Sequence, residues 1–171
     1  MSVLIKIQVN EVKERFSDSA SLVEHVAKEI VAYHDGPKSQ LSFLYGMVDR
    51  GTLEFRYTTA GALVPHLWRK TKRVTLPKAI HPPLGGAPTS SFEENRVTLQ
   101  PGDTLLLHSD GFQPILEKLG SHLYTKSQSD PHQLRNLWMG KMDELFDKKR
   151  PSDDITVIQI RIDEKALFLA S

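Results

Sequence analysis

The spacing of apolar residues changes twice along this chain, and the changes limit the folds that it can adopt. Residues 18–36 carry apolar residues three and four positions apart, as on one face of a helix. Asp18 and Ser19 can cap its start, and an Asp-Gly-Pro sequence ends it. From residue 41 to residue 61 the period is two, which is typical of strands, and helical spacing returns after residue 111. Runs of strands followed by runs of helices predict an α+β fold rather than alternating βαβ units.

Three pairs of strands, two of them hairpins, are expected in the middle of the chain. Residues 41–49 and 52–61 are joined by an Asp-Arg-Gly turn, and Leu53, Phe55 and Tyr57 are expected to face the core. Residues 63–69 and 72–76 form another strand pair. Residues 96–99 lead through a Pro-Gly turn into residues 103–109, which predicts a second hairpin at that turn.

The ends of the chain are less uniform. Residues 3–16 fit both an alternating and a helical pattern, and the helix is favoured because good helix formers extend it without a breaker. Helices are expected over residues 112–120 and 131–149. The β-branched run at residues 154–162 is typical of a buried strand.

The bulk composition excludes several classes of protein. A chain of 171 residues fits one domain over residues 1–171. The net charge of +1 offers no electrostatic case for nucleic acid or anionic lipid. The chain contains no cysteine, which excludes disulfide frameworks and thiolate metal sites and suits a reducing compartment. With no apolar run near the ~20 residues that span a bilayer, we expect a cytoplasmic protein or the cytoplasmic domain of a larger one.

Carboxylates occur where two of the expected strands begin or end. Residues 109–111 (Ser-Asp-Gly) follow the strand at 103–109, and residues 152–154 (Ser-Asp-Asp) precede the strand at 154–162. A carboxylate at a strand end is held by a rigid sheet and still reaches solvent, which suits a hard cation such as Mg²⁺ or Mn²⁺. Asp-Gly turns and acidic strand edges are also common without any ligand, so the residue types alone leave both interpretations open.

Single histidines and tryptophans have simpler interpretations. His66 and His81 are expected at the surface or in loops. Trp68 and Trp138 are expected to be core or subdomain-packing aromatics. Strand alternation places His108 on the same face as residue 110, so it either lines a site there or fills the sheet rim.

Four longer stretches resemble one family. Residues 99–112 (LQPGDTLLLHSDGF), 151–162 (PSDDITVIQIRI), 43–68 (FLYGMVDRGTLEFRYTTAGALVPHLW) and 81–86 (HPPLGG) resemble motifs of metal-dependent protein phosphatases (PPM type, relatives of protein phosphatase 2C). The motifs are those of the bacterial SpoIIE/RsbU-like branch, and they occur in the order found in that branch over nearly the whole chain.

The resemblance implies a fold and a chemistry. The fold would be an α-β-β-α sandwich, with two antiparallel sheets flanked by helices. Asp110 and Asp153 match metal ligands, Asp154 matches a supporting or additional ligand, Gly111 belongs to the same motif, and His108 would line the site. A water activated by two Mn²⁺ or Mg²⁺ ions, and no side-chain nucleophile, would attack a phosphoserine or phosphothreonine. In bacterial relatives the typical substrate is a phosphorylated anti-sigma-factor antagonist.

The chain also departs from the family pattern. The opening "G-D-x-x-D" and "D-V-x-G-H-G" motifs, which supply the other ligands, are absent, so the fold is expected to lack the N-terminal strands of the family. Ala62 replaces a motif histidine, and Pro114 a motif glutamate. At most one weakly held cation and little or no phosphatase activity are expected.

Three origins remain open on sequence grounds: a fragment, a truncated gene product, or a degenerate relative whose sheet is completed by a partner chain or a missing N-terminal segment. The alternative function is a non-catalytic module that docks a signalling partner.

Overall fold

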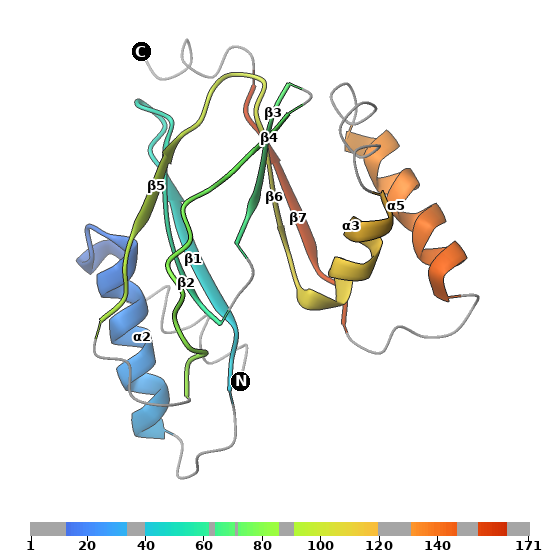
Figure 1. Ribbon diagram of the computed structural model, residues 1–171. Helices are drawn as coiled ribbons and strands as arrows, with labels where there is room; N and C mark the ends of the chain where they lie inside the picture. Colours follow the sequence, from blue (N-terminus) through green and yellow to red (C-terminus); the bar gives the residue numbers. More distant parts are fainter. Residues whose placement is uncertain are drawn as a thin grey trace. The chain divides into compact units, whose positions relative to one another are not determined.

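The computed structural model describes residues 13–33, 40–61, 64–70, 72–85, 91–119, 131–146 and 154–163. The chain divides into two compact units, one made of Met1–Ala62 and Pro77–Thr98 and the other of Leu63–Leu76 and Leu99–Ser171. Each unit has its own antiparallel sheet and its own helices (Figure 1). The prediction of an α+β fold with two antiparallel sheets is therefore confirmed, while a single domain over the whole chain stays a prediction.

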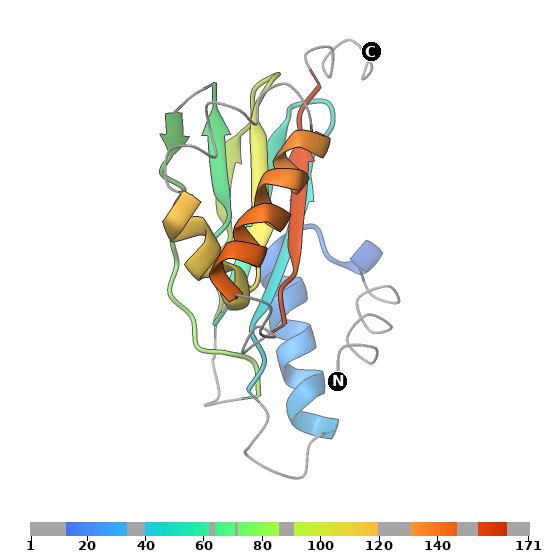
Figure 2. The same ribbon diagram turned by 90° about the vertical axis from the view of Figure 1, so that its right-hand side faces the viewer.

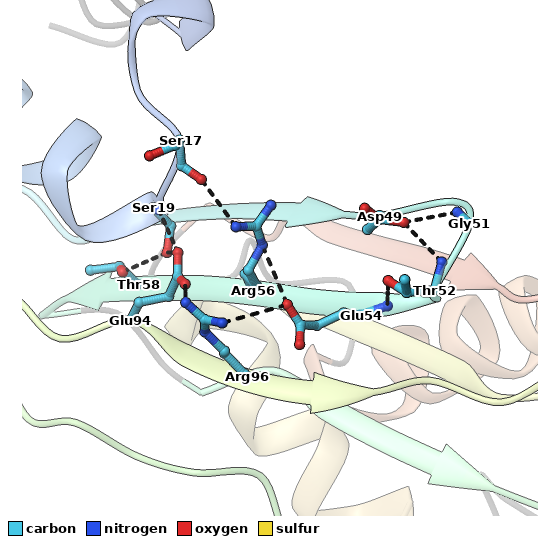
Figure 3. A network of polar contacts seen from close by, with 10 residues as sticks. All are labelled: Ser17, Ser19, Asp49, Gly51, Thr52, Glu54, Arg56, Thr58, Glu94 and Arg96. Atoms are coloured by element: carbon cyan, nitrogen blue, oxygen red, sulfur yellow. Dashed lines mark hydrogen bonds and ion pairs between the residues drawn. The ribbon is translucent and has the colours of Figure 1, made fainter.

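The first unit contains a three-stranded sheet in the order β1-β2-β5. Its strands are β1 (Phe43–Val48), β2 (Glu54–Ala60) and β5 (Asn95–Thr98), all antiparallel. The predicted hairpin between β1 and β2 is confirmed, and its turn is held by Asp49, whose Oδ1 accepts hydrogen bonds from the backbone N–H groups of Gly51 and Thr52 at 2.8 Å each (Figure 3). Leu53, Phe55 and Tyr57 are buried as expected.

Helix α2 (Ser19–Tyr33) packs on this sheet, after a short 3-10 helix η1 (Lys13–Arg15) (Figure 1). Its buried face joins residues of the sheet and of the following loops in one core cluster: Leu22, Val23, Val26, Ile30, Ala60, Leu84 and Phe92. Burying the four helix side chains contributes about 6–12 kcal/mol before the entropy cost of ordering them. The apolar face predicted from the spacing in residues 18–36 is thus the face that is buried in the core.

The first turn of α2 is also fixed to the sheet by polar contacts (Figure 3). The carboxylate of Glu94, just before β5, accepts hydrogen bonds from Ser19 N at 2.6 Å and Ser19 Oγ at 3.0 Å. Asp18 caps the helix, because its Oδ1 accepts a hydrogen bond from Ser21 N at 2.7 Å, and this bond holds the pKa of Asp18 below its usual value. Two acids at a helix N-terminus also suit the positive end of the helix dipole.

The second unit contains a four-stranded sheet in the order β4-β3-β6-β7. The strands are β3 (His66–Arg69), β4 (Lys72–Val74), β6 (Thr104–His108) and β7 (Val157–Arg161). A 3-10 helix η2 (Asp110–Phe112), α3 (Gln113–Leu119) and α5 (Pro131–Phe146) complete it, and α3 packs on α5 (Figure 2). None of the helices described in either unit is long and apolar enough to cross a membrane.

The core of this unit is aromatic and aliphatic. It consists of Trp68, Leu106, Phe112, Ile115 and Leu116, with Leu137, Trp138, Met142, Ile155 and Val157 packed against it. Trp68 is thus a core residue, and Trp138 is a partly buried aromatic that packs against the core, as expected of core or packing aromatics.

The hairpin predicted at the Pro-Gly turn of residues 101–102 is wrong. Strand β5 pairs with β2 in the first unit, whereas β6 pairs with β3 and β7 in the second. The turn itself is present: Asp103 N donates to Gln100 O at 2.9 Å, and Gly102 has φ +84°. A tight turn between two strand patterns is needed equally by a hairpin and by a crossing from one sheet to another, so the local sequence does not distinguish them.

The last strand is not the buried strand that its composition indicated. Strand β7 lies at the end of the sheet order, and Ile158 and Ile160 are 53% and 37% exposed. A run of β-branched residues reports strand propensity, while burial depends on what covers each face. Of the helix favoured for residues 3–16, residues 3–12 lie outside the described residues, and within residues 13–16 only the short 3-10 helix η1 is present. The residues after 163 also lie outside the described residues.

Two glycines offer a matched test of these packing arguments. Gly61 has φ +63°, and a Cβ there would lie 2.5 Å from Pro83 Cγ and 2.8 Å from Pro83 Cα, whereas a Cβ on Gly140 in α5 would meet nothing within 4 Å. Gly61→Ala is expected to lower the free energy of unfolding by about 2–4 kcal/mol. Gly140→Ala is expected to raise it by up to about 1 kcal/mol through helix propensity. Urea unfolding measures both, and equal effects would contradict the packing described at Gly61.

Candidate functional site

Two strand ends that carry acidic residues meet at one edge of the second sheet. Strands β6 and β7 are antiparallel with His108 opposite Val157, so the end of β6 lies beside the start of β7. Ser109 joins them further: its N–H donates to Thr156 O at 3.0 Å, its hydroxyl donates to Asp154 O at 3.0 Å, and its Oγ accepts from Thr156 N at 2.9 Å. We call residues 109–111 and 154–156, held together by these bonds, the β6–β7 rim.

The two described carboxylates of the rim are exposed to solvent. Asp110 begins η2, where Phe112 N donates to Ser109 O at 3.0 Å and the buried Phe112 ring anchors the turn. The strand has therefore ended before Asp110, so the alternation that placed residues 108 and 110 on one face does not apply. Asp154 lies in the extended segment before β7. Asp153 lies outside the described residues, so its predicted role as a ligand stays a prediction.

Gly111 is required by a close approach of the two chain segments. A Cβ at this position would lie 2.6 Å from Asp154 O and 3.2 Å from Asp154 C, and backbone atoms cannot yield as a flexible side chain can. The backbone of Asp154 therefore sits directly against the turn that follows Asp110. Gly111 serves the rim through its lack of a side chain rather than through any polar group.

His108 connects the rim to a buried histidine. His108 Nδ1 lies 2.8 Å from Ser109 O, and its Nε2 lies 3.1 Å from His66 Nε2. Because a carbonyl oxygen only accepts, His108 donates from Nδ1, and its Nε2 then accepts from His66. The His66 ring stacks on Trp68 with ring centroids 5.6 Å apart. The structure thus places His108 at the rim, in contact with Ser109.

The prediction that His66 is a surface or loop residue is wrong. His66 is the first residue of β3 and only 7% exposed. Burial is the main cause that lowers its pKa to about 4, and Arg73 and His108 lower it further. The signal that could have located it is the alternation with Trp68, two residues later on the same strand face. Ser109, which joins the two strand ends, was also missed, because its role depends on a segment 45 residues away.

The described residues contain no group of three or more histidines or carboxylates arranged to hold a metal ion. Pro114, which stands at a motif glutamate position, is exposed in the first turn of α3, where proline is well tolerated. Ala62, which stands at a motif histidine position, lies outside the described residues. The rim therefore gathers Asp110, Asp154 and backbone oxygens, and this donor set suits a hard cation by type but is small in number.

Comparisons with known proteins identify the fold and then the family. The structure is similar to the phosphatase domain of SpoIIE from Bacillus subtilis with part of its regulatory domain (19% identity, TM-score 0.71), to the SiaA-PP2C domain of Pseudomonas aeruginosa (18%, 0.72) and to RsbX in complex with magnesium (18%, 0.67). The matches cover 93%, 93% and 92% of this chain and 49%, 66% and 70% of those chains. The α+β fold is thus that of PP2C phosphatase domains.

The family follows from the sequence. Residues 1–163 match the family described as Stage II sporulation protein E (SpoIIE), so the chain belongs to the SpoIIE family. The resemblance to the SpoIIE/RsbU-like branch of PPM phosphatases is therefore confirmed. No curated protein matches the sequence.

Burial of neutral His66 predicts a pH dependence of stability. Its folded pKa of about 4 lies below the unfolded value near 6.5, so the unfolded chain takes up a proton first as the pH falls. Stability is expected to fall by about 1–2 kcal/mol from pH 7.5 to pH 5 because of this group. Urea unfolding at both pH values should show a smaller loss for His66→Gln than for the wild type or for His25→Gln. An unchanged loss in His66→Gln would contradict this origin.

Proposed function

We propose that this chain carries one part of a metal-dependent phosphoserine/phosphothreonine phosphatase site, and that the β6–β7 rim is that part. The observation that supports this most is a set of three hydrogen bonds, two donated and one accepted by Ser109, which join the turn of Asp110 to the backbone of residues 154–156. Two acidic turns that were only solvated would not require residues 109–111 and 154–156 to be held this close together.

The proposed roles follow from the chemistry of the donors. Asp110 and Asp153 would bind the cation, Asp154 would support it or bind a further one, Gly111 would permit the close approach, and His108 would line the site. Carboxylate and carbonyl oxygens are the ligands that Mg²⁺ and Mn²⁺ prefer. When bound, such a cation supplies a water of lowered pKa and neutralises charge on phosphoryl oxygens. Solved relatives were studied with magnesium and after soaking in manganese, which is consistent with this choice of metals.

The proposed site is incomplete in this chain. Two or three carboxylates leave most positions of a cation to water, so we propose that at most one cation is held, weakly, and that activity is low or absent. The remaining ligands and sheet strands would come from a preceding N-terminal segment or from a partner chain. The substrate class we propose is a cytoplasmic phosphoprotein of bacterial regulatory signalling, of the anti-sigma-factor antagonist type.

A second candidate function is a non-catalytic module that docks a signalling partner. It is favoured by the lack of any three-residue metal cluster within the described ranges and by proline at position 114. The two candidates differ in one measurable property, which is whether the rim binds a divalent cation at all.

Manganese binding tests the metal-site proposal. Calorimetric titration of the wild type with Mn²⁺ is expected to show one weak site, and Asp110→Asn is expected to weaken binding at least about tenfold, since one charged ligand is removed. Asp143→Asn, which removes an exposed acid of α5, is the matched control and should bind like the wild type. Equal heats in all three proteins, or none in any, would contradict the proposal and favour the docking module.

Phosphatase assays test the incompleteness. With Mn²⁺ and a phosphoserine peptide, the rate of phosphate release with this chain is expected to equal the rate with Mn²⁺ and no protein. The reason is that the chain holds no second, bridged cation. Turnover that requires both Mn²⁺ and Asp110 would show that the site is complete and would overturn this part of the proposal.

A further inference from the structure

A concave pocket of about 190 Å³ lies at one end of the second sheet. It is lined by Arg69 and Lys70 of the β3–β4 hairpin, by the turn of residues 100–103 and by Arg161 at the end of β7. Antiparallel pairing of β3, β6 and β7 brings these segments to the same end of the sheet (Figure 1). All of the lining residues belong to the second unit, so that unit alone builds the pocket.

The floor of the pocket is built around the buried carboxylate of Asp103. Arg69 donates two hydrogen bonds to it, from Nε to Oδ1 at 3.1 Å and from Nη2 to Oδ2 at 2.9 Å, and Gln100 N donates to Oδ2 at 2.8 Å. Ile162 N donates to Asp103 O and Gly102 N donates to Ile162 O, both at 2.9 Å, so this turn is fixed to the end of β7. The pocket therefore has a fixed shape before any ligand binds.

Two further cations give the pocket its charge. Lys70 and Arg161 are exposed, and neither forms an ion pair with any residue that the structure describes. Arg69 offsets the charge of Asp103, so the two positive charges of Lys70 and Arg161 remain, in a chain whose net charge is only +1. A phosphate monoester carries close to two negative charges at neutral pH, and its charge therefore matches that of the pocket.

The backbone of Lys70 has a conformation that lysine rarely adopts. Lys70 lies in the turn between β3 and β4 with φ +55°, in the left-handed region where asparagine and glycine are the usual residues. Leu53 also has φ +55°, but its side chain is buried in the core, whereas the side chain of Lys70 is exposed. Packing therefore does not explain a lysine at this turn, and a strained residue of this kind is a reason to look for a function of its side chain.

We propose that this pocket binds a phosphate group, with Lys70 and Arg161 as its two cationic ligands. The guanidinium of Arg161 can donate to two phosphate oxygens at once, and the ammonium of Lys70 supplies a compact charge. Strand β6 runs from this pocket to the β6–β7 rim, and Asp103 and Ser109 are six positions apart. At about 3.4 Å per residue, the pocket and the rim are about 20 Å apart. The bound phosphate is therefore separate from any group at the rim, and its binding needs no metal ion.

An NMR titration tests the proposal. Sodium phosphate is added at constant ionic strength to the ¹⁵N-labelled chain in EDTA, so that no divalent cation occupies the rim. The amide signals of Lys70, Gly102 and Arg161 are expected to shift and saturate, without comparable shifts for residues 109–111. A phosphoserine peptide is titrated in the same way, because inorganic phosphate and a phosphorylated protein present the same group. Tighter binding of the peptide would identify a phosphoprotein as the ligand, and equal or weaker binding would identify the free ion.

Matched variants test the assigned ligands. Lys70→Asn is expected to weaken phosphate binding about tenfold, since it removes one of two cations, and Arg161→Gln should do the same. The urea midpoint of Lys70→Asn should stay the same or rise, because asparagine adopts a positive φ more readily than lysine. Lys72→Asn makes the same charge change on the same hairpin but outside the pocket, and it should bind within about twofold of the wild type. Shifts that do not saturate, or an equal loss of binding in Lys70→Asn and Lys72→Asn, would overturn the proposal.

Discussion

The structure of the second unit depends on strand β6, which is paired with β3 on one side and with β7 on the other. Leu105 and Leu106 are almost fully buried. Its start is held by Asp103, 1% exposed, whose carboxylate accepts two hydrogen bonds from Arg69 at 3.1 and 2.9 Å. A buried carboxylate is stable only when it is paired in this way. Its end is held by Ser109, which joins it to the segment before β7.

The geometry of the rim follows from this anchoring. With both ends of β6 held, the turn of Asp110 has little freedom to move away from Asp154, and Gly111 allows the backbones to meet. The buried His66 adds support from β3 through His108 to the carbonyl of Ser109. The described residues of the rim are thus held firmly in place but offer few oxygen donors. Membership of the family therefore does not by itself give the rim a complete metal site.

The two edges of β7 have different neighbours. One edge is hydrogen-bonded to β6, and the other edge is not paired with any described strand. Ile158 and Ile160 are exposed. An unpaired, apolar edge is costly to leave open in solution, because it pairs readily with any compatible strand.

The sequence by itself determined the α+β class, the helix over residues 19–33, the β1–β2 hairpin and the family, because these depend on local period, turn residues and motif order. Through the motif resemblance it also predicted that Asp110, Asp153 and Asp154 belong to one metal site, and this stays a prediction. Only the tertiary structure decided that β5 and β6 belong to different sheets, that His66 is buried, and that Ile158 and Ile160 are exposed. Pairing partners and burial are set by contacts between residues far apart in the chain, and a local pattern of apolar residues carries no information about which segment provides them.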